Sequence, residues 1–229
     1  MRAMILAAGL GTRMRPLTLK TPKPLLTAAG KPLIQFHIEH LVAAGAERIV
    51  INHAWLGEQI ESALGDGSRF GVELVYSPEA EPLETAGGIR QALPLLADDK
   101  DDSFLVVNGD VYTDLAPDRL REMELNAGCD AHLLLVDNPA WHPEGDFHLE
   151  DTGLVLNSGS PKLTFSGVSM LRASLFTDLV SGEAAALAPI LRQAMASKKV
   201  AGERLNAYWD DIGTPERLSA LDKRLKGES

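Results

Sequence analysis

The chain has 229 residues, of which 45% are hydrophobic and 24% charged, and it carries a formal net charge of -10 at pH 7. This composition is typical of a soluble globular protein with one substantial core, and the acidic balance argues against bulk nucleic-acid binding, which needs a broad basic face. The single cysteine, Cys129, excludes an intrachain disulfide, and no apolar run reaches the length of a membrane helix, so we expect a cytoplasmic protein without membrane contact.

The first half of the chain alternates strand and helix patterns. The segment 3–8 is small and almost continuously apolar, as expected for a strand that is covered on both faces. In chain order we expect strands at 3–8, 48–52, 72–77, 104–110 and 131–137, and helices at 32–44, 58–64, 87–96 and 118–126. This order predicts an α/β fold of Rossmann-like type, with a mostly parallel mixed sheet and helices on both faces.

The pattern changes after residue 138. Short strand-like pieces at 146–150, 153–157 and 163–171 follow one another, and helices at 174–180 and 184–196, a strand at 200–205 and a last helix after Pro215 complete the chain. We interpret the charge run at 98–102 as a solvated loop. The whole chain, 1–229, is predicted to form a single domain with a small lid region in its second half.

A basic segment follows the first expected strand, with the sequence "LAAGLGTRMRPLTLKTPKP". The first 38 residues contain six of the 22 Lys and Arg and none of the 32 Asp and Glu. Gly9 and Gly11 let the backbone turn sharply and expose N–H groups, and the Arg13 guanidinium can bind phosphate oxygens with two donors. Prolines stiffen the loop that carries Lys20 and Lys23, although two solvated lysines on a surface loop would look similar. The segment therefore indicates an anion site.

Two common phosphate-binding motifs do not fit this segment. It lacks the G-x-x-x-x-G-K-[ST] pattern of P-loop proteins. It also departs from the dinucleotide fingerprint, because Met14 stands where the third glycine should be, which disfavours a nicotinamide-dependent oxidoreductase.

The basic segment resembles the signature of the sugar nucleotidyltransferases, which join a sugar 1-phosphate to a nucleoside triphosphate. The similarity continues with "PLETAGGI" at 82–89, "NGD" at 108–110 and "YWDDIGTPERL" at 208–218. It implies an enzyme that releases pyrophosphate and uses Mg²⁺ as its cofactor. It also implies that residues 1–137 bind the nucleotide and that 138–229 bind the sugar and complete the metal site.

The resemblance also assigns roles to individual residues. It implies that Arg13, Lys23 and Asp110 are catalytic. The nucleotide-binding residues that it implies are Ala8, Gly9, Gly11, Thr12, Arg13, Lys23, Thr85, Gly87, Gly88 and Asn108. It implies that Asp110 and Asp211 are the metal ligands, whereas the sequence alone leaves the neighbouring Asp210 open. Without the resemblance, an aspartate after a strand reads as a turn or cap residue.

The sugar-facing residues are implied by the stretch "HPEGDFHLE" at 142–150. The implied substrate-binding set is Asp110, Gly145, Glu150 and Lys162. Lys162 is taken from "SPKLTFSGVSML" at 160–171, and a solvated surface lysine would look similar. The Glu-Lys-Pro motif that the family uses for the sugar phosphate is missing, and Glu84 stands where the family commonly has glycine. We interpret Trp55 and Trp141 as packing or loop anchors and Trp209 as support for the Asp211 turn.

The segments "HPEGDF", "FSGVSML" and "WDDIGTPERL" are most similar to those of one branch of the family. The enzymes of that branch transfer a uridylyl group from UTP to N-acetylmuramate 1-phosphate in cell-wall (peptidoglycan) recycling. "PLETAGG" is also similar to mannose-1-phosphate guanylyltransferases, which stay as an alternative. A non-catalytic nucleotide-sugar sensor with the same fold is a second alternative, although the chain retains both implied metal carboxylates. The sequence leaves the oligomeric state open.

Overall fold

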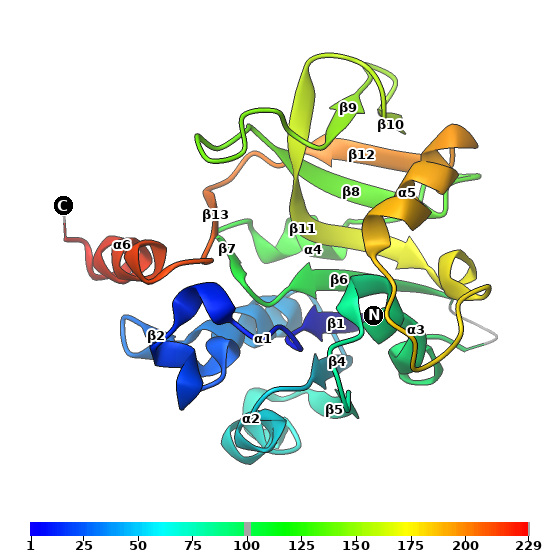
Figure 1. Cartoon of the computed structure of the whole chain (residues 1–229). Helices are drawn as coiled ribbons and strands as arrows, with labels where there is room; N and C mark the ends of the chain where they lie inside the picture. Colours follow the sequence, from blue (N-terminus) through cyan, green and yellow to red (C-terminus); the bar gives the residue numbers. More distant parts are fainter. Residues whose placement is uncertain (99–101, 229) are drawn as a thin grey trace.

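The computed structural model describes residues 1–98 and 102–228, and a nine-stranded mixed sheet forms its centre (Figure 1). The strands of this sheet are β1 (Arg2–Leu6), β4 (Arg48–His53), β5 (Glu73–Pro78), β6 (Ser103–Asn108), β8 (Ala131–Val136), β9 (Phe147–Leu149), β10 (Val155–Leu156), β11 (Lys162–Arg172) and β12 (Val200–Arg204). The helices are α1 (Leu33–Ala43), α2 (Gly57–Leu64), α3 (Glu84–Leu96), α4 (Pro117–Arg121), α5 (Leu187–Ala196) and α6 (Pro215–Lys226).

The sheet is mostly parallel, as the alternation of patterns predicts. β1 lies between β4 and β6 and is parallel to both, and β5 is parallel to β4. β11 lies between β6 and β8 and is antiparallel to each, while β12 returns parallel to β8. β11 therefore separates a parallel block formed by the first half of the chain from the mixed strands of the second half.

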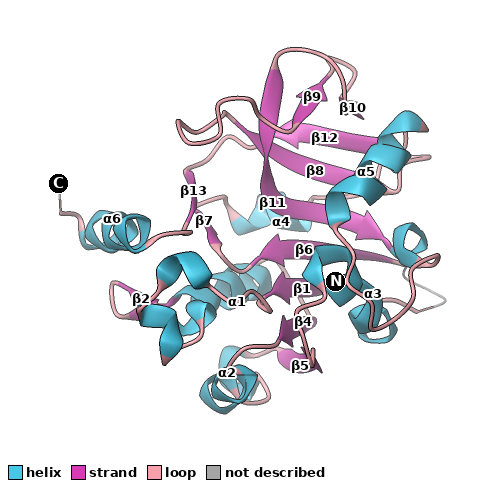
Figure 2. Ribbon diagram, viewed as in Figure 1, coloured by secondary structure: helices cyan, strands magenta, loops and turns pink. Residues whose placement is uncertain are grey.

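Helices cover both faces of the sheet (Figure 2). Successive residues of a strand point to opposite faces, so Ile5 of β1 packs in one core cluster with Ile38 of α1, while Met4 packs in another with Ile89 of α3. All four side chains are fully buried. Burial of a side chain of this size contributes about 1.5–3 kcal/mol, which explains the apolar run in β1.

The expected helices of the second half are corrected in two places. The segment 174–180 does not form an α-helix but a 3-10 turn at Ala173–Phe176, because one or two turns rarely nucleate a stable helix. The helix expected from 184 begins at Leu187. The Ala185 carbonyl is not free for a helical hydrogen bond, because it accepts the N–H groups of Ala86 and Gly87 in α3. The charge run expected as a loop lies partly outside the described residues.

Two other boundaries differ from the sequence pattern. α3 begins at Glu84 rather than at 87, and α4 ends at Arg121 rather than at 126. Two small ribbons complete the fold, β2 (Thr27–Ala28) with β3 (Lys31–Pro32) and β7 (Val111–Thr113) with β13 (Trp209–Asp211). Among the described residues, no helix has the length and apolarity that crossing a membrane requires.

Candidate active site

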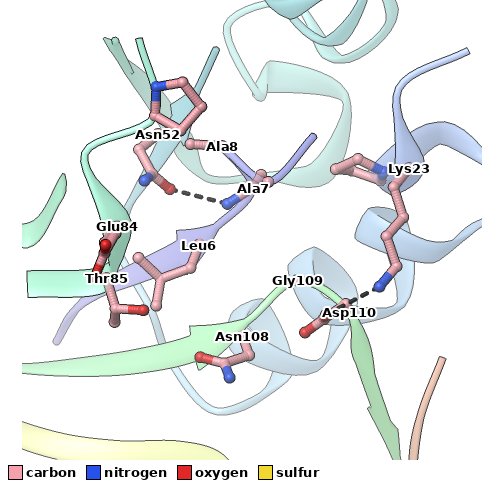
Figure 3. A pocket seen from close by; sticks show the side chains of 13 residues that line it. Leu6, Ala7, Ala8, Lys23, Asn52, Glu84, Thr85, Asn108, Gly109 and Asp110 are labelled. Carbon is pink, nitrogen blue, oxygen red and sulfur yellow. Dashed lines mark hydrogen bonds and ion pairs between the residues drawn. The ribbon is translucent and has the colours of Figure 1, made fainter. Parts of the chain in front are cut away.

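A pocket of about 250 Å³ opens where β1, β4 and β6 end (Figure 3). The carboxyl ends of parallel strands meet at one edge of a sheet, and ligands of open α/β folds bind there. The lining residues are Leu6, Ala7, Ala8, Gly9, Lys23, Pro24, Asn52, Pro82, Glu84, Thr85, Asn108, Gly109 and Asp110. Six of the residues that the sequence singles out, Ala8, Gly9, Lys23, Thr85, Asn108 and Asp110, lie on its wall.

The basic loop between β1 and α1 folds back on itself beside this pocket. Gly11 has a φ of +61°, and a Cβ at this position would lie 2.8 Å from Thr18 Cγ2, so both backbone conformation and space favour glycine. Thr18 Oγ1 donates to the Gly11 carbonyl at 2.7 Å, and Trp55 Nε1 donates to the Thr18 carbonyl at 3.0 Å. The loop is thus fixed by specific hydrogen bonds as well as by its prolines, and Trp55 anchors it.

Lys23 reaches Asp110 across the pocket (Figure 3). Its Nζ donates to Asp110 Oδ2 at 2.9 Å, and the lysine side chain is 11% exposed while that of Asp110 is 39% exposed. Asp110 lies two residues after the end of β6, and Gly109 between them donates its N–H to the Leu6 carbonyl at 2.9 Å. The pair therefore places a buried ammonium group and a partly exposed carboxylate side by side at this edge of the sheet.

Asp211 comes to the same edge through the ribbon of β7 and β13. It is paired in register with Val111, and the N–H of Ile212 donates to the Asp110 carbonyl at 2.7 Å. Asp210, one residue earlier, faces Tyr112 in the register and lines a different cavity together with Asn206. The Asp211 segment is thus joined to Asp110 through the backbone of Ile212, whereas Asp210 lines a separate cavity.

Two arginines surround the Asp211 carboxylate. Arg217 Nη1 lies 3.1 Å from Oδ2, and Arg13 Nη2 lies 4.0 Å from the same atom. Oδ1 is buried and has no hydrogen-bond partner among the described residues. Arg13 is 61% exposed, and neither it nor Gly11 or Thr12 lines the pocket, so these three residues stand at the rim of the site.

His37 of α1 lies beneath this edge and keeps it free of an additional charge. Burial lowers the pKa of His37 to about 4, with a further lowering from the charge of His40 and an opposing effect of Asp110. Its Nε2 has no hydrogen-bond partner among the described residues. The imidazole is neutral near pH 7, so Lys23 is the cation in contact with Asp110.

The glycine pair of α3 packs against protein. A Cβ on Gly87 would lie 2.4 Å from the Glu183 carbonyl oxygen, and one on Gly88 would lie 2.6 Å from Glu79 Oε1. Neither glycine lines the pocket, whereas Glu84 and Thr85 do. Glu84 has a φ of +58°, a region that glycine occupies more readily than a residue with a side chain.

Asn52 is a site residue that the sequence pattern does not reveal. It lies near the carboxyl end of β4 and lines the pocket. Its Oδ1 accepts the Ala7 N–H at 2.9 Å, and its Nδ2 donates to Glu79 Oε1 at 2.7 Å. Glu79 Oε2 in turn accepts the Leu83 N–H at 2.8 Å. This buried network joins the turn after β1 to the start of α3, and both segments line the pocket.

Replacing Asn52 with alanine should lower the free energy of unfolding by about 2–3 kcal/mol, because the buried Ala7 N–H and Glu79 carboxylate each lose a partner. Urea denaturation measures this difference. Glu73→Ala, which removes the exposed Arg48 pair between β4 and β5, is the control and should change stability by less than about 1 kcal/mol. Equal effects of the two substitutions would contradict the importance of the network.

A second cavity, of about 230 Å³, adjoins the first and shares Thr85 and Asn108 with it. Its walls are mostly apolar and include Phe147, Phe165 and Leu187. Of the residues expected to face the sugar, Gly145 precedes Asp146, which does line this cavity. Glu150 and Lys162 line neither cavity: the Glu150 carboxylate accepts the Thr152 hydroxyl, and Lys162 pairs with His148 at the start of β11.

Comparison with known proteins agrees with this geometry. A family model described as "Nucleotidyl transferase" matches residues 2–140. The chain is 53% identical to an N-acetylmuramate alpha-1-phosphate uridylyltransferase of Neisseria meningitidis, over 95% of both chains. It is 30% identical to the mannose-1-phosphate guanylyltransferase catalytic subunit beta of Drosophila melanogaster, over 94% of this chain and 60% of the relative.

The fold itself has a close counterpart among solved structures. A Bacillus anthracis protein described as a glucose-1-phosphate thymidylyltransferase superposes with a TM-score of 0.83, covering 100% of this chain and 97% of the other, at 18% identity. At this identity the likeness concerns the fold alone. The family model and the relatives at higher identity carry the assignment: the chain belongs to the nucleotidyl transferase family, among the sugar-1-phosphate nucleotidyltransferases.

Proposed function

We propose that this protein transfers a uridylyl group from UTP to N-acetylmuramate 1-phosphate and releases pyrophosphate. The observation that carries the proposal is the Lys23–Asp110 pair in the wall of the pocket, at the sheet edge that the Asp211 segment reaches through the bond from the Ile212 N–H to the Asp110 carbonyl. The 53% identity to a relative with this activity supports the choice of substrates. Because UTP is made inside cells, we propose a cytoplasmic enzyme of peptidoglycan recycling.

The chemistry of the donor set fits Mg²⁺. Asp110 and Asp211 offer carboxylate oxygens, the ligands that Mg²⁺ prefers, and the buried Oδ1 of Asp211 has no partner among the described residues. Within residues 1–98 and 102–228, no three His, Cys, Asp or Glu side chains gather into a metal site. The remaining ligands would therefore be water and phosphate oxygens, as is usual for Mg²⁺ in phosphoryl transfer.

The reaction needs no general base. A phosphate oxygen of the sugar 1-phosphate, which is already anionic, attacks the α-phosphorus of UTP, and the bond from that phosphorus to the β-phosphate oxygen breaks. Lys23 and Arg13 offset the negative charge that the two reactants bring together. When bound, Mg²⁺ supplies Lewis-acid stabilisation of phosphate charge. The turn at Ala8 and Gly9 and the residues Thr85 and Asn108 hold the nucleotide in this scheme.

The second cavity supports a sugar with an apolar substituent. Its walls of Phe147, Phe165 and Leu187 offer room for an acetamido methyl group beside Thr85 and Asn108. We propose that residues 138–229 supply this sugar site and Asp211, and that residues 1–137 supply the nucleotide site. Gly145, Glu150 and Lys162 remain proposed sugar contacts, of which Glu150 and Lys162 would have to act from outside both cavities.

A product screen by mass spectrometry tests the proposal. Purified protein with Mg²⁺ is incubated with UTP, GTP, dTTP or CTP, each crossed with the 1-phosphates of N-acetylmuramate, N-acetylglucosamine, glucose and mannose. We expect UDP-N-acetylmuramate as the dominant product. GDP-mannose as the main product would contradict the proposed substrates and favour the guanylyltransferase alternative. Tight nucleotide-sugar binding without any product would favour the sensor.

A further inference from the structure

We propose that Arg217 is a positioning residue for the Asp211 carboxylate, and that Trp141 holds Arg217 from the loop 138–146. Metal binding at Asp211 and sugar binding beside this loop would then be coupled through direct contacts. The inference rests on the proposed function, because it takes Asp211 as a ligand of the divalent metal. Arg217 contacts neither cavity, so its effect would pass through Asp211.

Arg217 donates hydrogen bonds to two atoms of Asp211. Its Nη1 donates to the Asp211 backbone carbonyl at 2.9 Å and to Oδ2 at 3.1 Å. Arg217 lies in the first turn of α6, whose N-cap Thr214 accepts the Arg217 N–H through its hydroxyl, so the backbone of the arginine is itself fixed. The contact occupies Oδ2 and leaves the buried Oδ1 without a partner among the described residues. Arg217 thereby sets which carboxylate oxygen is available.

The Trp141 ring packs against the Arg217 guanidinium. The Arg217 Cζ lies 4.2 Å from the centroid of the Trp141 ring, a cation–π contact, and the Trp141 ring is stacked against Trp209 with centroids 6.3 Å apart. Trp209 belongs to β13 and donates its Nε1–H to the Ser166 carbonyl at 2.8 Å. Trp141 is 45% exposed, so the loop that carries it lies at the surface beside Arg217.

The same loop reaches the second cavity. His142 Nε2 lies 3.1 Å from Asp146 Oδ1, and Asp146 Oδ2 accepts the Phe165 N–H at 2.8 Å. Asp146 and Phe165 both line the cavity that we assign to the sugar. A continuous set of contacts therefore runs from the sugar cavity through the loop 138–146 to Arg217 and Asp211.

Charge and positioning predict opposite results when Arg217 is changed. A cation 3.1 Å from a metal ligand repels the metal, so its removal would strengthen metal binding if charge alone mattered. If Arg217 positions the carboxylate, its removal weakens metal binding. Lysine cannot replace it, because a compact ammonium lacks the planar group that stacks on the Trp141 ring while Nη1 donates to Asp211. Loss of a group that orients a metal ligand typically costs about 10–100-fold in affinity.

The experiment measures Mn²⁺ affinity by electron paramagnetic resonance, with a non-hydrolysable UTP analogue and without sugar phosphate. We expect Arg217→Lys and Arg217→Met to weaken Mn²⁺ binding about tenfold or more. Trp141→Ala should weaken it by a smaller factor and also raise the KM for the sugar 1-phosphate, and Trp141→Phe should restore part of both. The matched control is Arg224→Lys, since Arg224 also lies on α6 and stacks on an aromatic ring, that of Tyr208 at 3.7 Å.

A double-mutant cycle shows whether Arg217 acts through Asp211. In an Asp211→Asn background, Arg217→Lys should cause little further loss of Mn²⁺ affinity, whereas independent effects would add. Unchanged or tighter Mn²⁺ binding in Arg217→Lys, at a temperature where thermal denaturation shows the variant folded, would overturn the inference even with an active wild type. Absence of nucleotide-sugar product from the wild type would instead contradict the proposed function.

Discussion

Asp110→Asn should lower kcat by about 10³-fold or more while leaving the protein folded. The substitution removes the charge of one of the two carboxylates proposed to hold Mg²⁺, and a bound metal contributes several kcal/mol of transition-state stabilisation, at 1.36 kcal/mol for each tenfold in rate. It also leaves Lys23, which is 11% exposed, opposite a neutral amide. Initial rates of pyrophosphate release at saturating UTP and sugar 1-phosphate measure the effect.

A matched control separates this loss from a general effect of charge. Asp118 is an exposed aspartate on α4 that pairs with Arg121 at 3.0 Å, and Asp118→Asn should leave kcat unchanged. Urea unfolding of both variants checks that the fold is retained. An Asp110→Asn enzyme with kcat within a few-fold of wild type would remove Asp110 from the mechanism.

Lys23→Met should lower kcat by about 10²–10³-fold, the effect usual for the loss of one fixed donor to a developing charge. The methionine side chain retains the length and the apolar packing of the lysine stem, so the loss is confined to the ammonium group. The largest share is expected in kcat rather than in the KM for UTP, since the charge on the reacting phosphorus grows in the transition state. Steady-state kinetics over a range of UTP concentrations measure both parameters.

Lys20→Met is the control for this substitution. Lys20 belongs to the same basic loop but does not line the pocket, and we expect at most a two- to three-fold change, confined to KM, through the weaker field around the triphosphate. If Lys20→Met and Lys23→Met reduced kcat equally, the general positive charge of the loop, and not the position of Lys23, would account for catalysis.

The sequence predicts the parallel half of the fold because its signals are local. The apolar run of β1, the periodicity of α1 and the strand that ends at Asn108 each depend on neighbouring residues, and all three form within two residues of the expected bounds. The signals for Lys23 and Asp110 are also local, since Lys23 stands between two prolines of the basic loop and Asp110 follows Gly109 after β6. Their ion pair at 2.9 Å was not predicted, because the spacing between the two residues sets no distance between them.

The rest of the site depends on contacts between distant segments. Asn52 looks like any polar residue at the end of a strand until Ala7 and Glu79 are placed beside it. Arg217 likewise reads as a charged residue on an amphipathic helix, and its partners Asp211 and Trp141 come from separate segments. The correction at 184–196 has the same origin, since the carbonyl of Ala185 is taken by α3.

The reversed direction of β11 has an evolutionary consequence. Its last residues, Val168–Arg172, pair with β6, while its first residues extend past the end of β6 and carry the β9–β10 hairpin. Insertions or exchanges in that hairpin would therefore change the side of the molecule proposed to bind the sugar, without shifting the register of β1, β4 or β6. A lineage could in this way acquire a new acceptor sugar by changing the β9–β10 hairpin, while the residues proposed to bind the triphosphate stayed the same.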